Sequence, residues 1–168
     1  MKEESNHPKF NWEIFTDGAK NDSGTGAAMV IYNNQKAVAH EEYYKLADFC
    51  TVNQAELWAM ERALLYITKN IKNFKGPINI STDSRYVLNS INGSKKNTKT
   101  GVNIQHLARH LGKQRQITFC WVPGHSGSQG NDRADILAKK AVSSNQLSIA
   151  FDKIPHQLYT QVHKREDQ

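Results

Sequence analysis

The chain has 168 residues, 38% hydrophobic content and a formal net charge of +6, which fits one globular domain with a sizeable core. No apolar run approaches the roughly 20 residues that a membrane-spanning helix needs, and the polar start is unlike a signal peptide. From these features we expect a non-secreted protein of the cytoplasm or nucleus that does not contact a membrane.

The basic charge and the two cysteines narrow the class of protein only slightly. A positive net charge permits a polyanionic partner, although a run such as Lys95, Lys96 and Lys99 is equally compatible with a solvated face. Cys50 and Cys120 are too few for a disulfide framework or a zinc site, and their apolar neighbours predict buried free thiols.

Apolar periodicity predicts three strands and then a helix in the first half of the chain. A polar arm at residues 1–11 comes first. The strands are expected at 13–16, 27–32 and 36–46. Thr51 and Gln54 fit a capping box, which predicts that a helix begins there. Its apolar stripe comprises Met60, Ala63, Leu64 and Ile67.

The second half alternates strands with helices. The strands are expected at 78–82 and 116–122, and the helices at 86–91, 102–111 and 131–142. Polar residues 92–101 predict a loop, and so do the Gly-flanked residues 123–127. The pattern weakens beyond Ser143. The domain is therefore expected at 12–143, followed by an extension of unknown role at 144–168.

This order of elements predicts an α/β fold with a mixed five-stranded sheet and helices on both faces. The first three strands form an antiparallel meander, and the other two arrive through helical crossovers, so they are parallel to their neighbours. The expected strand order is 3-2-1-4-5. Chain order then reverses between the first and fourth strands, and such a crevice is where α/β folds place their functional sites.

Two stretches with the same design lead into that crevice. Residues 14–18 and 80–84 both run from apolar strand residues through Thr-Asp to a small residue that turns the chain. Asp17 and Asp83 should therefore lie at equivalent ends of neighbouring strands. One acidic cluster, assembled from distant parts of the sequence, is expected there.

A third and a fourth acid come from the predicted helices. Glu56 lies at the start of an apolar stripe, where a carboxylate is costly unless a cation, or a partner such as Arg62, accompanies it. Asp132 and Asp135 both lie near the start of the last helix, and their spacing leaves open which one turns toward the crevice. Four carboxylates without a Cys or His set favour Mg²⁺ or Mn²⁺. Two such ions about 4 Å apart can activate water and stabilise the leaving oxygen at a phosphodiester.

His125 and the aromatic residues each have two interpretations. His125 could transfer a proton near neutral pH, although a histidine in a loop is more often simply solvated. Tyr43, Tyr44 and Tyr86 could line a nucleic-acid surface. The tryptophans have apolar neighbours and are expected in the core or at its rim: Trp12, Trp58 and Trp121.

Five short motifs follow one another across roughly residues 12–143. They are Phe15-Thr16-Asp17-Gly18, Asn53-Gln54-Ala55-Glu56-Leu57, Ser81-Thr82-Asp83-Ser84-Arg85-Tyr86-Val87, Trp121-Val122-Pro123-Gly124-His125-Ser126-Gly127 and Gly130-Asn131-Asp132-Arg133-Ala134-Asp135-Ile136-Leu137-Ala138. In this order they resemble the type 1 ribonuclease H family, and the resemblance implies the ribonuclease H-like fold.

The resemblance implies an endonuclease that hydrolyses the RNA strand of RNA–DNA hybrids by a two-metal mechanism, with Mg²⁺ that Mn²⁺ can replace. It selects Asp135 over Asp132 as the fourth acid. The implied catalytic and metal-binding carboxylates are Asp17, Glu56, Asp83 and Asp135. His125 resembles the family histidine that assists proton transfer or product release. The implied substrate-binding residues are Gly18, Thr51, Asn53 and Ser84.

The chain departs from the family pattern in two places. Val52 stands where many members have an Asn that contacts the minor groove of the hybrid, so some hybrid contacts must be rearranged. The interval between Asp83 and Trp121 is short, and it lacks the additional basic helix of the cellular bacterial form.

The amino-acid sequence around His125 is similar to that of ribonuclease H domains fused to the reverse transcriptases of non-LTR retrotransposons. This similarity implies a reverse transcriptase polyprotein as the parent and its other portion as a partner. The absence of heptads from the sequence predicts a monomer.

Two other classes of function compete with the nuclease. One is an inactive module that binds hybrid or double-stranded RNA, and the other is a strand-transfer nuclease on the same fold. The presence of all four acids and the histidine argues against the first, because buried acids without a function cost stability. The acidic spacing and the His-Gly loop argue against the second.

Overall fold

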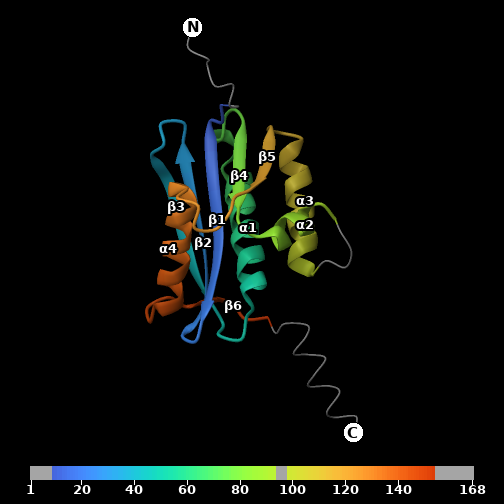
Figure 1. Ribbon diagram of the computed structural model, residues 1–168. Helices are drawn as coiled ribbons and strands as arrows, with labels where there is room; N and C mark the ends of the chain where they lie inside the picture. The colour runs from blue at the N-terminus through green and yellow to red at the C-terminus, as the bar shows by residue number, and fades with distance from the viewer. Residues whose placement is uncertain (1–8, 94–97, 154–168) are drawn as a thin grey trace.

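A computed structural model describes residues 9–93 and 98–153, and its centre is a mixed sheet (Figure 1). The strands are β1 (Trp12–Asn21), β2 (Gly24–Asn33), β3 (Val38–Leu46), β4 (Ile78–Thr82), β5 (Ile117–Trp121) and β6 (Ile149–Phe151). The helices are α1 (Val52–Lys69), the 3₁₀ turn η1 (Ile71–Asn73), α2 (Arg85–Ile91), α3 (Lys99–Gly112) and α4 (Gln129–Ser143).

The strand order is β5-β4-β1-β2-β3-β6, which contains the predicted order 3-2-1-4-5. Strands β1, β2 and β3 form an antiparallel meander, β4 is parallel to β1, and β5 is parallel to β4. The predicted fold class is therefore confirmed. The crossovers through helices explain the parallel pairs, because a strand that returns through a helix runs in the direction of its neighbour.

The predicted number of strands is wrong, because the extension contributes a sixth one. Strand β6 pairs in parallel with β3 through Lys45 with Ile149 and Leu46 with Phe151. It has three residues, and Ile149 is more than half exposed, so no apolar alternation marks it in the sequence. The part of the extension beyond residue 153 lies outside the described residues, as does most of the predicted N-terminal arm.

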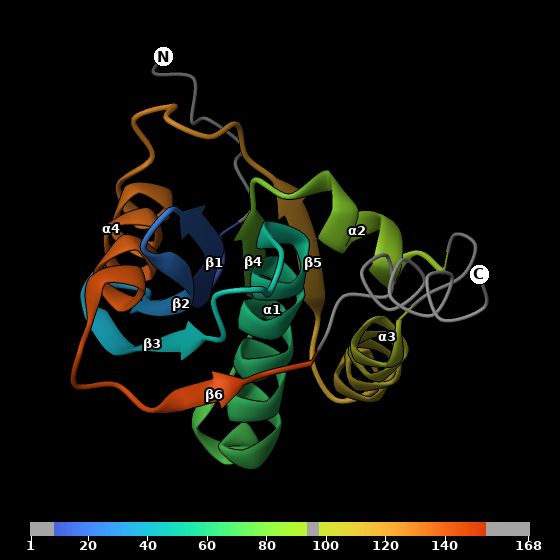
Figure 2. The same cartoon turned by 90° about the horizontal axis from the view of Figure 1, so that it is seen from below.

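The sheet is covered on both faces (Figure 2), by α4 on one side and by α1 with α2 and α3 on the other. Strand β2 is buried along nearly its whole length, since Met29 and Ile31 face α1 while Ala28 and Val30 face α4. Helix α4 approaches β2 at Gly26, where an added Cβ would lie 2.4 Å from a helix carbonyl oxygen. A larger residue at this position would push α4 away from the sheet.

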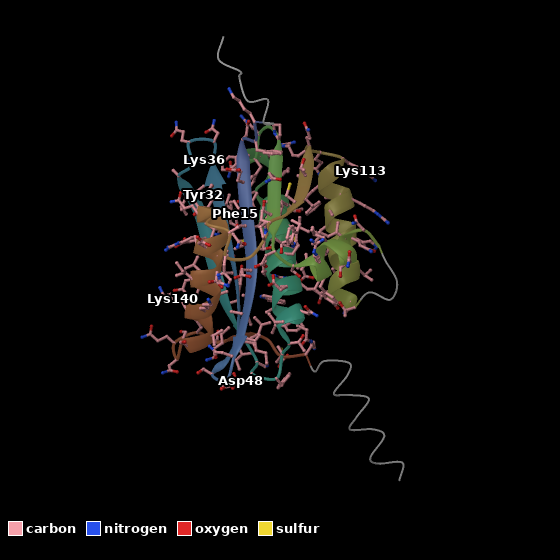
Figure 3. The ribbon with its side chains drawn as sticks, viewed as in Figure 1. Phe15, Tyr32, Lys36, Asp48, Lys113 and Lys140 are labelled. Atoms are coloured by element: carbon pink, nitrogen blue, oxygen red, sulfur yellow. The ribbon has the colours of Figure 1, made fainter. Side chains whose placement is uncertain are left out.

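The aromatic side chains Phe15 and Tyr32 (Figure 3) help to seat α4 on the sheet. Their rings meet edge to face with centroids 5.8 Å apart. Gly130 in the first turn of α4 lies so close to the Phe15 ring that an added Cβ would overlap it. The first turn of α4, which precedes Asp135, is thereby held against β1.

The predicted start of one helix is confirmed, and the predicted start of another is wrong. The capping box of α1 is confirmed, because the Thr51 hydroxyl accepts from Gln54 N and the Gln54 side chain accepts from Thr51 N. Helix α3 begins at Lys99, inside the stretch that was predicted to be a loop, and Thr98 caps it. The polar residues at the start of this helix suggested a loop, but the Thr98 hydroxyl accepts from Gly101 N and caps the helix. Lys95 and Lys96 lie outside the described residues.

Both cysteines are free, as predicted, with Cys50 buried and Cys120 only partly buried. Among the described residues, no helix has the length and apolar character needed to cross a membrane.

Candidate active site

Asp17 and Asp83 lie side by side at the edge between β1 and β4. The two strands are parallel and pair Thr16 with Thr82, so the next residue in each is the aspartate. Strand β4 ends there because the Thr82 hydroxyl accepts from Ser84 N at 3.0 Å and turns the chain into α2. The juxtaposition that the repeated Thr-Asp pattern predicted is therefore present, and Asp17 is only 4% exposed.

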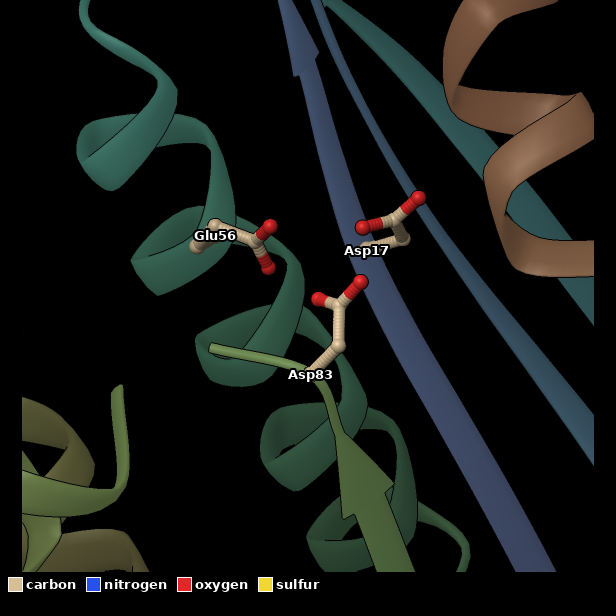
Figure 4. A group of neighbouring side chains, drawn as sticks. All are labelled: Asp17, Glu56 and Asp83. Carbon is tan, nitrogen blue, oxygen red and sulfur yellow. The ribbon is translucent and has the colours of Figure 1, made fainter. Parts of the chain in front are cut away.

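Glu56 reaches the same point from α1. Helix α1 can approach β1 this closely because Gly18 has no side chain, and an added Cβ there would lie 2.7 Å from Glu56 N. Figure 4 shows the three carboxylates converging from β1, α1 and the end of β4. One oxygen from each of Asp17, Glu56 and Asp83 lies within 4.8 Å of the others. We call these three residues the acidic cluster.

The acidic cluster is electrostatically unfavourable without a cation. Burial, assisted by the charges of Asp83 and Asp135, raises the pKa of Asp17 to about 7. Burial is also the main cause that raises the pKa of Glu56, with Asp17 second, and it raises the pKa of Asp83. All three shifts follow from holding like charges together out of water.

The donor set fits a hard divalent cation. The Glu56 Oε2 atom is buried and has no hydrogen-bond partner among the described residues. Arg62, the alternative partner for Glu56, instead pairs with Glu61 at 2.8 Å. A site made of carboxylate oxygens alone is the kind that Mg²⁺ and Mn²⁺ prefer, and such an ion would relieve both the repulsion and the unpaired oxygen.

Asp135 lies beside the acidic cluster rather than within it. Its charge is among the causes that raise the pKa of Asp17 and of Asp83, and the charge of Asp132 is not among those causes. The Asp135 Oδ2 atom accepts from Lys139 Nζ at 2.8 Å, one turn further along α4. The electrostatic proximity supports the choice of Asp135 over Asp132, which the spacing in the sequence left open.

His125 is exposed on the loop between β5 and α4, with a left-handed backbone at φ 56°. This loop passes directly over Asp83, since a Cβ added at Gly124 would lie 3.0 Å from Asp83 Oδ2. The charge of His125 partly offsets the burial that raises the pKa of Asp83. The histidine therefore lies within electrostatic reach of the acidic cluster and remains accessible to solvent.

The prediction for Trp121 is wrong, because this side chain is 42% exposed at the edge of the site. Its indole N–H donates to the Asp83 carbonyl oxygen at 3.1 Å. The Arg85 guanidinium lies over the ring, 4.1 Å from its centroid. The sequence analysis did not propose Arg85 as a site residue. Its position two residues after Asp83 could have indicated that it lies at the site. Trp12 and Trp58 pack against the core, as predicted.

The predicted substrate-binding residues differ in accessibility. Asn53 is exposed at the start of α1, next to Val52, which is 42% exposed. Thr51 and Ser84 cap α1 and α2 by accepting from backbone N–H groups, which leaves each hydroxyl hydrogen available to a ligand. Gly18 serves the close packing of α1 on β1.

The predicted aromatic surface is dispersed. Tyr86 is 41% exposed near the site. Tyr43 lies under Lys140, and the Tyr44 hydroxyl donates to Glu42. Only Tyr86 therefore presents a substantially exposed ring.

Comparison with known proteins assigns the family. The RNase H family model matches residues 10–143. The chain belongs to the RNase H family. The Ribonuclease H of Stutzerimonas stutzeri (strain A1501) is 35% identical over 145 residues, which are 77% of this chain and 90% of that protein. The Ribonuclease H of Francisella philomiragia is 34% identical over 150 residues, which are 80% and 93% of the two chains. Membership makes this chain a ribonuclease H, a hydrolase of phosphodiester bonds.

Solved structures agree with this fold. LC11-RNase H1 in complex with RNA/DNA hybrid is 23% identical with a TM-score of 0.61, and the match covers 78% of this chain and 96% of that one. The foamy viral protease-reverse transcriptase in complex with RNA/DNA hybrid is 25% identical with a TM-score of 0.63. That match covers 80% of this chain but 20% of the viral one.

Proposed function

We propose that this ribonuclease H is a metal-dependent endonuclease that cuts the RNA strand of RNA–DNA hybrids, with its catalytic domain at residues 12–143. The observation that carries the proposal is the convergence of Asp17, Glu56 and Asp83 within 4.8 Å, with a buried Glu56 oxygen that lacks a partner among the described residues. The family match and the related structures that hold RNA/DNA hybrid support it.

The acidic cluster and Asp135 would hold two divalent ions, Mg²⁺ or Mn²⁺. When bound, such ions activate water and stabilise the leaving oxygen of a phosphodiester. Asp17 lies in β1 and Asp83 directly follows β4, so the pairing of the two strands positions both carboxylates before any ligand arrives. Glu56 adds an oxygen that is already desolvated and therefore binds a cation with little competition from water.

His125 would move a proton at the edge of the site. Its imidazole is exposed, lies on a loop next to Asp83, and can both donate and accept a proton. In this position it can deliver a proton to the leaving oxygen of the cut strand or help the product to depart. Arg85, held over Trp121, adds a positive charge two residues from Asp83, where a phosphate would approach.

Thr51, Asn53, Ser84 and the backbone at Gly18 would contact the hybrid. The Thr51 and Ser84 hydroxyls can donate to phosphate or sugar oxygens while they cap their helices. Asn53 can reach base edges or sugars from the exposed start of α1.

We also propose that the chain derives from a retroelement reverse transcriptase polyprotein of the non-LTR type. The amino-acid sequence of the Trp121–Gly127 motif supports this origin. The likeness to a domain-sized part of a foamy viral reverse transcriptase supports a reverse transcriptase origin, but not the non-LTR type. The reverse transcriptase portion would then be a partner of a monomeric domain.

The test uses labelled RNA–DNA hybrid, duplex DNA and duplex RNA, each with Mg²⁺, with Mn²⁺ and with chelator. We expect cleavage of the hybrid's RNA strand alone, and only with metal. The Asp83→Asn variant should bind hybrid, keep its fold and lose cleavage. Tight binding without cleavage in either metal would instead indicate an inactive binding module, and cleavage or joining of duplex DNA would indicate a strand-transfer nuclease.

A further inference from the structure

Lys139 places a permanent cation at the edge of the acidic cluster. Its Nζ atom donates to Asp135 Oδ2 at 2.8 Å. Its pKa is raised by this hydrogen bond and by the charges of Asp135 and Asp17, so the ammonium also interacts with the acidic cluster. Within the acidic cluster itself, the Glu56 Oε2 atom is unpaired among the described residues.

The backbone of α4 is too well anchored to carry Asp135 toward the acidic cluster. Arg133 donates to both carboxylate oxygens of Glu41 on β3, at 3.0 and 2.7 Å. The apolar face of α4, including Ala134 and Ala138, is fully buried against the sheet. Asp135 can therefore change partners only by rotating its own side chain.

Such a rotation would draw the Asp135 Oδ2 atom away from Lys139 Nζ. Asp135 does not belong to the group of carboxylates whose oxygens lie within 4.8 Å of one another, so its side chain is directed to Lys139 in place of the shared position. The ammonium and a divalent cation thus compete for the same carboxylate. Lys139 is 57% exposed, so water can replace its contact at small cost.

We propose that Lys139 is a positioning residue that competes with the divalent cation for Asp135 and thereby weakens cation binding at that side of the site. This inference rests on the proposed function for the role of Asp135 as a metal ligand. In the metal-free chain the ammonium keeps Asp135 paired, and on metal binding the Asp135 carboxylate exchanges Lys139 for the cation. The exchange raises the cation concentration at which the site becomes complete.

The neighbouring residue provides a matched control. Lys140 carries the same charge on the same helix (Figure 3). Its ammonium lies over the Tyr43 ring, 5.0 Å from the centroid. Lys140→Met removes one positive charge without touching Asp135. Lys139→Met removes the same charge together with the ion pair, and Lys139→Arg keeps both.

The experiment is a calorimetric titration of the metal-free full chain with Mg²⁺, repeated with Mn²⁺ followed by the electron paramagnetic resonance of the free ion. We expect Lys139→Met to lower the dissociation constant about fivefold, the upper range for an exposed ion pair. Lys139→Arg and Lys140→Met should stay within about twofold of the parent. The tightening should disappear in the Asp135→Asn background, because the competition needs the carboxylate.

An unchanged constant in Lys139→Met overturns the inference, and so does an equal tightening in Lys140→Met, which would show a general charge effect. A parent chain that binds neither cation also overturns it. Since no nucleic acid is present, these outcomes are separate from the cleavage assay. A chain that cuts hybrid but shows no tightening keeps the proposed function and loses only the role of Lys139.

Discussion

Helix α1 carries two buried glutamates in opposite situations. Glu56 is 6% exposed and Glu61 is 7% exposed. Glu61 has a partner for each oxygen, since Arg62 donates to Oε1 at 2.8 Å and Asn103 donates to Oε2 at 3.2 Å. Glu56 faces two other acids and has an oxygen without a partner among the described residues.

The difference separates a structural acid from a functional one. A buried carboxylate with a cation and an amide around it is part of the packing between α1 and α3, and its removal leaves the partners unsatisfied. A buried carboxylate among other carboxylates opposes folding, because its charge is desolvated and repelled. Burial alone therefore does not identify a catalytic acid; the chemistry of its neighbours does.

The largest expected effect is the loss of cleavage in Glu56→Gln. This change removes a charge from the acidic cluster and should reduce hybrid cleavage by on the order of 10³-fold or more. The same change should stabilise the metal-free fold, because one of three repelling charges is gone. Steady-state cleavage and urea unfolding in chelator measure the two effects.

Glu61→Gln is the matched control on the same helix. It should leave cleavage within about threefold of the parent and lower the free energy of unfolding by about 1–2 kcal/mol, since the Arg62 side chain loses its ionic partner. If Glu56→Gln destabilises the metal-free chain as much as Glu61→Gln does, the contrast between the two glutamates is wrong.

The next largest effect separates the two aspartates of α4. Asp135→Asn should lower the cleavage rate at least about 100-fold. Asp132→Asn should cost less than about threefold, because Asp135, not Asp132, is among the charges that raise the pKa of Asp17 and of Asp83. Rates measured over a range of Mg²⁺ concentrations check both variants. A loss in Asp132→Asn as large as that in Asp135→Asn would reverse the assignment of the fourth acid.

The acidic cluster should also control the pH dependence of stability. The pKa of Asp17 is raised from 3.8 to about 7 in the fold, so between these values the folded chain binds more protons than the unfolded chain. The free energy of unfolding then falls as pH rises. The metal-free chain should lose on the order of 2 kcal/mol between about pH 5 and pH 7.5.

Urea unfolding at several pH values measures this loss. Mg²⁺ should remove most of it by stabilising the ionised carboxylates, and Asp17→Asn should flatten the curve in chelator. A metal-free chain whose stability does not decrease in this pH range would show that burial and repulsion in the acidic cluster do not raise the pKa of Asp17.

The sequence predicted those parts of the fold that local patterns determine. Strand β4 has the predicted bounds, because a short apolar run ends at a Thr-Asp turn. Strand β2 is longer than the predicted 27–32, because it begins at Gly24 and includes glycines that allow a close approach of other elements. Strand β6 was missed because its pairing with β3 is a long-range contact of three residues that leaves no local pattern.

The candidate site was predicted in composition but not in its contacts. The Thr-Asp repeat and the motif order indicated Asp17, Glu56 and Asp83, because local residue patterns predict where strands end and where helices begin. The pair between Asp135 and Lys139 depends on side-chain rotamers, and the exposure of Trp121 depends on its contact with the Asp83 carbonyl. Neither contact follows from residue types and spacing alone.

The smallest predicted effect concerns Val52, one turn before Glu56 on α1. Val52 is 42% exposed and its side chain cannot donate or accept a hydrogen bond, unlike the Asn that the family resemblance implies for this position. Val52→Asn should tighten binding of RNA–DNA hybrid about threefold, the value of one modest hydrogen bond, without changing the unfolding midpoint.

Val52→Ala is the control, since it removes the same apolar surface without adding a polar group. Equal hybrid affinity in the two variants, measured by fluorescence anisotropy with catalytically inactive Asp83→Asn protein, would show that the hybrid does not contact this position.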